Sequence, residues 1–138
     1  MSKQFHVTRT IAAPADEIWA LLTNSSGYRD WNQSIVSLDG QIAQGAKIAL
    51  VSTINPKRRF KLKVTELNKP TRMVWSSGMP FGLFTGRRTF TLTECAESTE
   101  FSMTEAFTGP LAGLITKAIP DMTESFNQFA DGLKTASE

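Results

Sequence analysis

The chain has 138 residues, 41% of them apolar and 20% charged, which is an ordinary globular composition. Its 15 basic and 13 acidic residues leave a net charge of +2, too small by itself to indicate a nucleic-acid-binding protein. One histidine and one cysteine exclude a zinc site of the usual kind and an intrachain disulfide, and no apolar run is long enough to span a membrane.

The first part of the chain predicts one strand followed by two short helices. Residues 3–11 have the character of a strand. Pro14 suits the first position of a helix in which Ile18, Leu21 and Leu22 share one face, and Asp16 suits the positive end of its dipole. Residues 25–32 are expected to form a second short helix or a turn.

The middle of the chain predicts a series of strands. Turn residues separate six strand-like segments, which cover residues 34–40, 46–54, 58–67, 71–78, 85–94 and 99–108. Because sequential strands with short connections usually pair with their neighbours, these segments favour an antiparallel meander.

The C-terminal part predicts a long amphipathic helix. From Leu111 to Leu133 the apolar residues recur at spacings of three and four, and Pro110 can open such a helix. Pro120 falls inside the pattern, so we expect a kink or break near residues 116–120. This helix is the only predicted element long enough to cover the apolar face of the sheet, and a pocket is expected between the two.

The chain shows no internal repeat and no low-complexity linker, so we expect a single domain over residues 1–138. The start of the sequence lacks the apolar segment of a secretory signal, and the lone Cys95 suits a reducing compartment. We therefore expect a cytoplasmic protein without a metal or cofactor.

The stretch "IAAPADEIWALLTNSSGYRDWN", residues 11–32, resembles the SRPBCC, or Bet v 1/START-like, superfamily in its polyketide cyclase/dehydrase-like branch. The matching residues are Ile11, Ala13, Pro14, Glu17, Ile18, Trp19, Leu21, Leu22, Tyr28, Trp31 and Asn32. A second match, "TEAFTGPLAGLI" at 104–115, resembles the family's junction between the last strand and the long helix. The resemblance implies an α+β helix-grip fold, in which a curved seven-stranded antiparallel sheet surrounds the C-terminal helix and a hydrophobic cavity.

Glu105 occupies an unexpected position, because it shares the apolar register of its strand with Met103 and Phe107. A hairpin that pairs Leu92 with Phe101 sets Arg88 opposite Glu105, and directly opposed charges offset the cost of burying each other. The pair is either a structural ion pair or a polar anchor, meaning a group that orients a ligand in an apolar pocket. An adjacent arginine makes Glu105 a poor general base, which counts against a catalytic role.

Two further segments have alternative interpretations. In "KRRFKLK", residues 57–63, the basic residues alternate with Phe60 and Leu62, which favours a strand with a solvated cationic face over a phosphate or anionic-surface site. The loop "MPFGLF", residues 79–84, is either packed or a pocket lid, and its apolar content favours a lid.

These observations favour the binding of a small hydrophobic or amphipathic ligand between the sheet and the C-terminal helix. The residues expected to contact the ligand are Phe60, Leu62, Trp75, Phe81, Phe84, Arg88, Phe90, Met103, Glu105, Leu114, Met122 and Phe126. One alternative is a cyclase or dehydratase acting on a polyketide-like or aromatic substrate, although the sequence contains no convincing catalytic set. Another is a ligand-free protein-interaction module. We expect a monomer or homodimer that neither binds nucleic acid nor integrates into a membrane.

Overall fold

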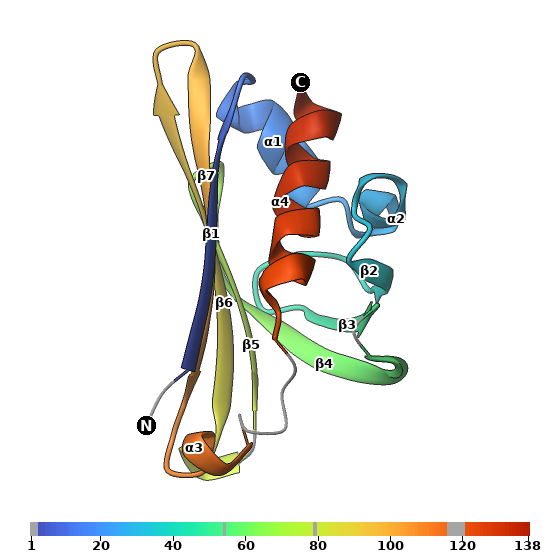
Figure 1. Cartoon of the computed structure of the whole chain (residues 1–138), viewed down its shortest axis with the longest axis vertical. Helices are drawn as coiled ribbons and strands as arrows, with labels where there is room; N and C mark the ends of the chain where they lie inside the picture. The colour runs from blue at the N-terminus through green and yellow to red at the C-terminus, as the bar shows by residue number, and fades with distance from the viewer. Residues whose placement is uncertain (1–2, 54, 79, 116–120) are drawn as a thin grey trace.

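The structure is a computed structural model that describes residues 3–53, 55–78, 80–115 and 121–138. Within these residues, seven strands form one antiparallel sheet in the order β1-β7-β6-β5-β4-β3-β2 (Figure 1). The strands are β1 Lys3–Ile11, β2 Ile35–Asp39, β3 Lys47–Ser52, β4 Asn55–Asn68, β5 Arg72–Gly78, β6 Thr85–Cys95 and β7 Ser98–Thr108. The sequence predicted each of them, and the antiparallel sheet is confirmed.

The described helices lie before the second strand, after the fifth and after the last. They are α1 Ala15–Leu22, η1 Ser25–Gly27, α2 Tyr28–Trp31, η2 Pro80–Gly82, α3 Ala112–Ile115 and α4 Thr123–Ser137, where η marks a 3-10 helix. In the part of the chain that the structure describes, no helix is long and apolar enough to cross a membrane.

The region in which the sequence predicted a long helix contains two described helices, α3 and α4. The C-terminal helix α4 begins only at Thr123, and Met122 precedes it. The Asp121 carboxylate accepts hydrogen bonds from the backbone N–H and the hydroxyl of Thr123, at 2.9 and 2.6 Å, and thereby caps the start of α4. The break predicted near residues 116–120 lies outside the described residues.

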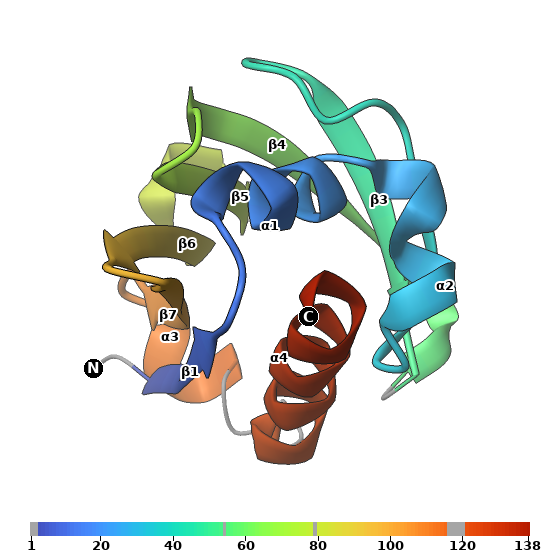
Figure 2. The same ribbon diagram turned by 90° about the horizontal axis from the view of Figure 1, so that it is seen from above.

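The sheet curves around α4, as the view from above shows (Figure 2). The face of α4 formed by Phe126, Phe129, Ala130 and Leu133 is buried against the concave side of the sheet. The Phe129 ring stacks parallel to that of Phe101 on β7, with 6.2 Å between the centroids. This arrangement confirms the expected helix-grip fold.

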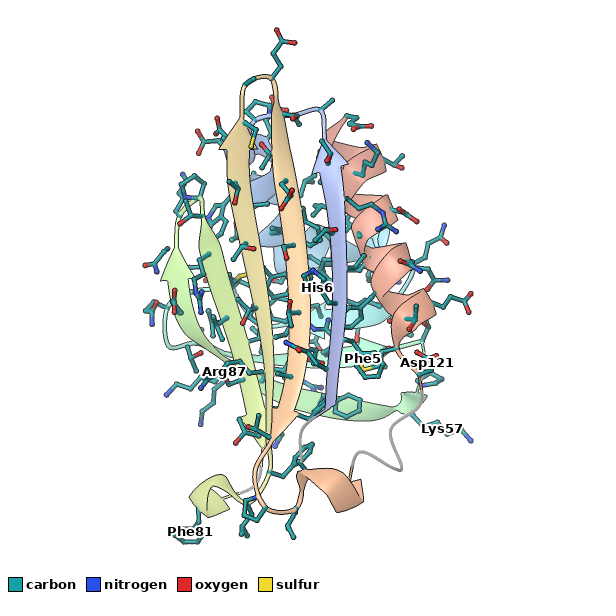
Figure 3. All side chains as sticks on the ribbon, turned by 60° about the vertical axis from the view of Figure 1, so that its left-hand side comes forward. Phe5, His6, Lys57, Phe81, Arg87 and Asp121 are labelled. Atoms are coloured by element: carbon teal, nitrogen blue, oxygen red, sulfur yellow. The ribbon has the colours of Figure 1, made fainter. Side chains whose placement is uncertain are left out.

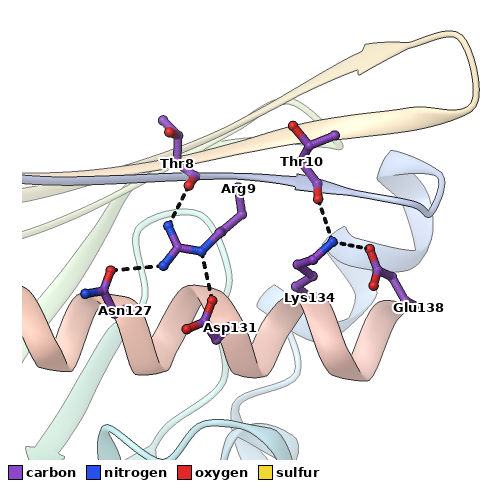
Figure 4. A network of polar contacts seen from close by, with 7 residues as sticks. All are labelled: Thr8, Arg9, Thr10, Asn127, Asp131, Lys134 and Glu138. Atoms are coloured by element: carbon purple, nitrogen blue, oxygen red, sulfur yellow. Dashed lines mark hydrogen bonds and ion pairs between the residues drawn. The ribbon is translucent and has the colours of Figure 1, made fainter.

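Polar contacts fix α4 to the edge strand β1 (Figure 4). Arg9 donates from Nε to Asp131 at 2.8 Å and from Nη2 to Asn127 at 3.0 Å. One turn further along, Lys134 donates to the Thr10 carbonyl at 2.9 Å and pairs with Glu138 at 2.6 Å. The distance between helix and sheet is therefore set at the edge of the sheet as well as by the core.

The predicted β6–β7 hairpin register is also confirmed. Leu92 pairs with Phe101, and Arg88 with Glu105. Across the concave face this register aligns one row of residues from five strands, which we call the central row: Phe5, Glu105, Arg88, Trp75 and Val64.

Candidate functional site

The central row contains a buried ion pair between Arg88 on β6 and Glu105 on β7. Arg88 donates from Nε to Glu105 Oε1 at 3.2 Å and from Nη2 to Oε2 at 3.3 Å, so the contact is bidentate. The side chains are only 9% and 14% exposed. Burial of either charge alone would be costly, and each group therefore offsets the desolvation of the other.

The guanidinium of Arg88 lies over the ring of Phe126 and close enough to Tyr28 to influence its ionisation. Its carbon lies 5.0 Å from the ring centroid of Phe126 on α4, within the range of a cation–π contact. Burial raises the pKa of Tyr28, and the charge of Arg88 partly opposes that shift. Tyr28 is therefore a neutral phenol at ordinary pH, and its hydroxyl donates to the Leu22 carbonyl.

Trp75, the next residue in the central row, carries an unused hydrogen-bond donor. Its indole Nε1 is buried and has no acceptor within the described residues. The indole ring packs edge-on against Phe90, with 4.7 Å between the centroids. A buried N–H without a partner loses its hydration without compensation, so this donor is a cost to the stability of the fold.

The structure brings several of the predicted site residues together, but as packed core. Phe90 and Met103 have no exposed surface, and Trp75 and Phe126 are at most 2% exposed. These side chains therefore pack directly against their neighbours and leave no space large enough for a water molecule beside them. The expected cavity therefore does not adjoin Phe90 or Met103 in this structure.

The apolar residues become half-buried toward the lower end of the sheet, below the start of α4, where β5 ends and β6 begins (Figure 1). Leu62 and Phe60 precede Val64 on β4, share its face and are partly exposed, as is Met122 before α4. Phe84 is also half-buried and stacks on Phe107, with 5.7 Å between the ring centroids. Glu105 is the more exposed member of its pair and lies at the border between packed core and this end.

One predicted site residue, Phe81, does not join the group. The Phe81 side chain is 98% exposed and points away from the molecule (Figure 3). Phe81, which belongs to the segment 79–84 that the sequence favoured as a pocket lid, therefore does not cover a pocket. The side chain of Leu114 lies outside the described residues.

Sequence reasoning missed Phe5, which pairs with Glu105 and whose ring lies 6.0 Å from that of Phe126. The position of Phe5 beside Glu105 results from the pairing of β1 with β7, which brings together strands from opposite ends of the chain. The alternation of apolar residues in residues 3–11 was the only available signal, and it could not give the register.

The arrangement supports binding better than proton transfer. Glu105 is held by a bidentate arginine, and the Tyr28 hydroxyl is already used by Leu22. Cys95 and His6 are exposed, and His6 contacts Thr104 on the sheet at 2.6 Å. In the described part of the chain, no group of three or more His, Cys, Asp or Glu side chains could hold a metal ion.

Comparisons with known proteins agree with this geometry. The family described as "Polyketide cyclase / dehydrase and lipid transport" matches residues 2–138. A sequence comparison with curated proteins found no match.

Several solved structures share the fold. The Zhui aromatase/cyclase from Streptomyces sp. R1128 superposes with a TM-score of 0.76 at 16% identity, covering 99% of this chain and 94% of that one. Truncated norcoclaurine synthase from Thalictrum flavum gives a TM-score of 0.72 at 15% identity, with 99% and 93% covered. A START superfamily protein from Mycobacterium smegmatis gives 0.70 at 15% identity, with 97% and 96% covered. At these identities the likeness shows the fold alone.

Proposed function

The chain belongs to the polyketide cyclase/dehydrase and lipid transport family, and from this premise we propose that it binds a small amphipathic molecule at the lower end of the sheet. The ligand would lie below the start of α4, against the central row. Its apolar body would contact the half-buried side chains of Phe5, Phe60, Leu62 and Met122. Its polar group would meet Arg88 and Glu105.

The observation that carries the proposal is the ion pair of Arg88 and Glu105 within an apolar row. A buried pair usually stabilises a fold no better than apolar residues of similar size would, so packing alone gives little reason for it. The pair lies where the packed core gives way to partly exposed apolar surface. A few polar groups in such surroundings are typical of sites that orient an apolar ligand.

The donors of Arg88 indicate which polar group the ligand carries. Arg88 has donors only, and it uses Nε and Nη2 to hold Glu105. An oxygen acceptor on the ligand, such as a carbonyl, would meet the rest of the guanidinium. We therefore propose a ligand with an apolar body and at least one acceptor oxygen.

A cyclase or dehydratase is the second function that the family description suggests. It would require Glu105 to take a proton from the ligand while its two oxygens accept hydrogen bonds from Arg88. The geometry supports this less well than binding, because hydrogen bonds to the charged form of a carboxylate oppose its protonation.

Binding of Nile red, a neutral dye that has an apolar ring system and a carbonyl oxygen, tests the proposal by fluorescence titration. Leu62→Gln should weaken binding about tenfold, because it removes apolar contact at the lower end. Leu67→Gln is the matched control, since Leu67 is a half-buried leucine on the same strand at the opposite end, and it should leave binding nearly unchanged.

The double variant Arg88→Met with Glu105→Gln should remain folded and bind the dye at least about tenfold more weakly, because a hydrogen-bonded polar contact is lost. Equal effects of the two leucine variants, or full binding by the folded double variant, would contradict a site at the lower end.

A further inference from the structure

The charges of this chain are strongly segregated along the sequence, although they nearly cancel overall. Residues 40–93 contain ten basic residues and one acidic residue, Glu66. The rest of the chain contains five basic and twelve acidic residues. Since 40–93 includes β3, β4 and β5 and most of β6, one half of the sheet is cationic and the remainder of the molecule is acidic.

Four of these cationic side chains lie on the outer face of the sheet, opposite α4. Lys47 pairs with Lys63, which pairs with Ser76, which in turn pairs with Arg87, and Lys61 lies on the same face. All four basic side chains are exposed, and within the described residues no acidic group lies at ion-pair distance from them. We call these four residues the basic face.

A shallow groove runs through the basic face. It has a volume of about 540 Å³ and is lined by residues that include Lys47, Lys61, Lys63 and Ser76. Asp39 at its edge is paired with Arg59 at 3.5 Å. Gly78, the last residue of β5, also lines the groove, and the next described residues, 80–84, form the segment that we call the η2 loop.

The η2 loop exposes apolar side chains at this end of the basic face. Phe81 is 98% exposed and Leu83 is 39% exposed. The backbone of Phe81 has φ 63° and ψ 22°, a left-handed conformation that is unfavourable for a residue with a side chain. Full exposure of a phenylalanine on strained backbone has no benefit for folding, which indicates an interaction with something outside the chain.

The two residues that follow Phe81, Gly82 and Leu83, are held against the segment that follows β7. Leu111 donates its backbone N–H to the Leu83 carbonyl at 2.9 Å. A Cβ atom at Gly109 would lie 2.7 Å from the carbonyls of Gly82 and Leu83, so the two segments are in close contact. Figure 3 shows Phe81 at the lower tip of the molecule, with Arg87 above it on the same side.

We propose that the basic face and the η2 loop together dock on an anionic lipid bilayer. Phe81 and Leu83 enter the interfacial region, while Lys47, Lys61, Lys63 and Arg87 lie near the negatively charged headgroups. An apolar tip combined with basic residues is the chemistry that binds peripheral proteins to such surfaces. Nucleic acid or an acidic protein would also match the charge, but a bilayer offers in addition a continuous hydrocarbon layer that an exposed phenylalanine and leucine can enter.

This surface is independent of the proposed ligand site, because it uses the outer face and a loop tip. Docking through this surface would nevertheless turn the lower end of the sheet toward the bilayer. Membrane docking can therefore be tested without any ligand, and its failure would leave the proposed function standing.

Flotation with phosphatidylcholine vesicles, with and without phosphatidylserine, tests the proposal on the full chain. We expect binding only to vesicles that contain phosphatidylserine, and loss of binding at high salt. Lys63→Glu and Phe81→Asp should each weaken binding about tenfold. Arg29→Glu is the control for charge, because exposed Arg29 lies in the acidic part of the chain, and Val36→Asp is the control for exposed apolar residues.

Phe81→Trp gives a second measurement that does not depend on loss of binding. The exposed indole should shift its emission to shorter wavelength when phosphatidylserine vesicles are added, because it leaves water. The proposal is overturned by absent binding, by equal binding to neutral vesicles, or by full binding of folded Phe81→Asp. Equal loss in Arg29→Glu, or Phe81-independent binding to RNA that exceeds vesicle binding, would also overturn it.

Discussion

The ion pair of Arg88 and Glu105 can be tested by a double-mutant cycle. Arg88→Met keeps an apolar side chain beside Phe126, and Glu105→Gln keeps the shape of the carboxylate. Each single change leaves the other charge at 9% or 14% exposure without its partner. Removal of one partner from a completely buried ion pair typically costs about 3–5 kcal/mol. Because this pair keeps some exposure, we expect each single variant to lose about 2–4 kcal/mol of unfolding free energy.

The double variant removes both charges and should recover most of this loss. We expect its free energy of unfolding to lie within about 1 kcal/mol of the wild-type value, which means a coupling energy of about 2 kcal/mol or more. Urea denaturation followed by circular dichroism measures all four proteins. Additive effects within about 0.5 kcal/mol would show that the two side chains do not interact.

Arg72 and Glu66 provide the matched control cycle. They also pair across neighbouring strands, with Nε 2.9 Å from Oε2, but their side chains are 48% and 37% exposed. Solvent screening should limit their coupling to about 1 kcal/mol or less. Equal coupling in both cycles would contradict the argument that burial, rather than distance, sets the strength of the Arg88–Glu105 pair.

Two changes on α4 test the packing of the helix on its neighbours. Phe126→Ala should lower the free energy of unfolding by about 3–5 kcal/mol in urea denaturation, because the ring is buried and covers Arg88. A loss below about 1 kcal/mol would contradict the helix-grip packing. Gly132→Ala should be destabilising by about 1–3 kcal/mol, because its Cβ would lie 2.0 Å from the Trp31 carbonyl oxygen, whereas helix propensity alone predicts a gain of about 1 kcal/mol. A measured gain would show that α2 and α4 do not approach so closely, and Thr135→Ala, at an exposed position of α4, serves as control.

The strands were predictable from the sequence because their signals are local. Turn residues separate the strand segments, and neighbours in sequence pair in space from β2 to β7. The contact of Arg88 with Glu105 followed from the same logic, since a short hairpin joins β6 to β7. The start of α4 was not predictable from apolar spacing, because the Asp121 cap interrupts a pattern that continues through it.

Other features depend on contacts that local patterns do not contain. The position of Phe5 beside Glu105 requires the register between β1 and β7, which are far apart in sequence. The outward direction of Phe81 follows from its left-handed backbone, which apolar content alone does not reveal. The tight packing of Phe90 and Met103 depends on how α4 fits the curved sheet, so period-2 alternation could place them on the concave face but not beside a cavity.

The location of the ion pair connects the stability of the fold to the proposed site. Above the central row, Met103 and Phe90 are completely buried, and a charge there would be removed from water almost entirely. Toward the lower end, Leu62 and Phe60 are half-buried, and a charge would be strongly screened. Arg88 and Glu105 lie between these two regions, where their bidentate contact can hold them in one geometry while Glu105 keeps some exposure. A ligand at the lower end could therefore reach the pair without displacing any core residue, and it would find the arginine already oriented by its partner.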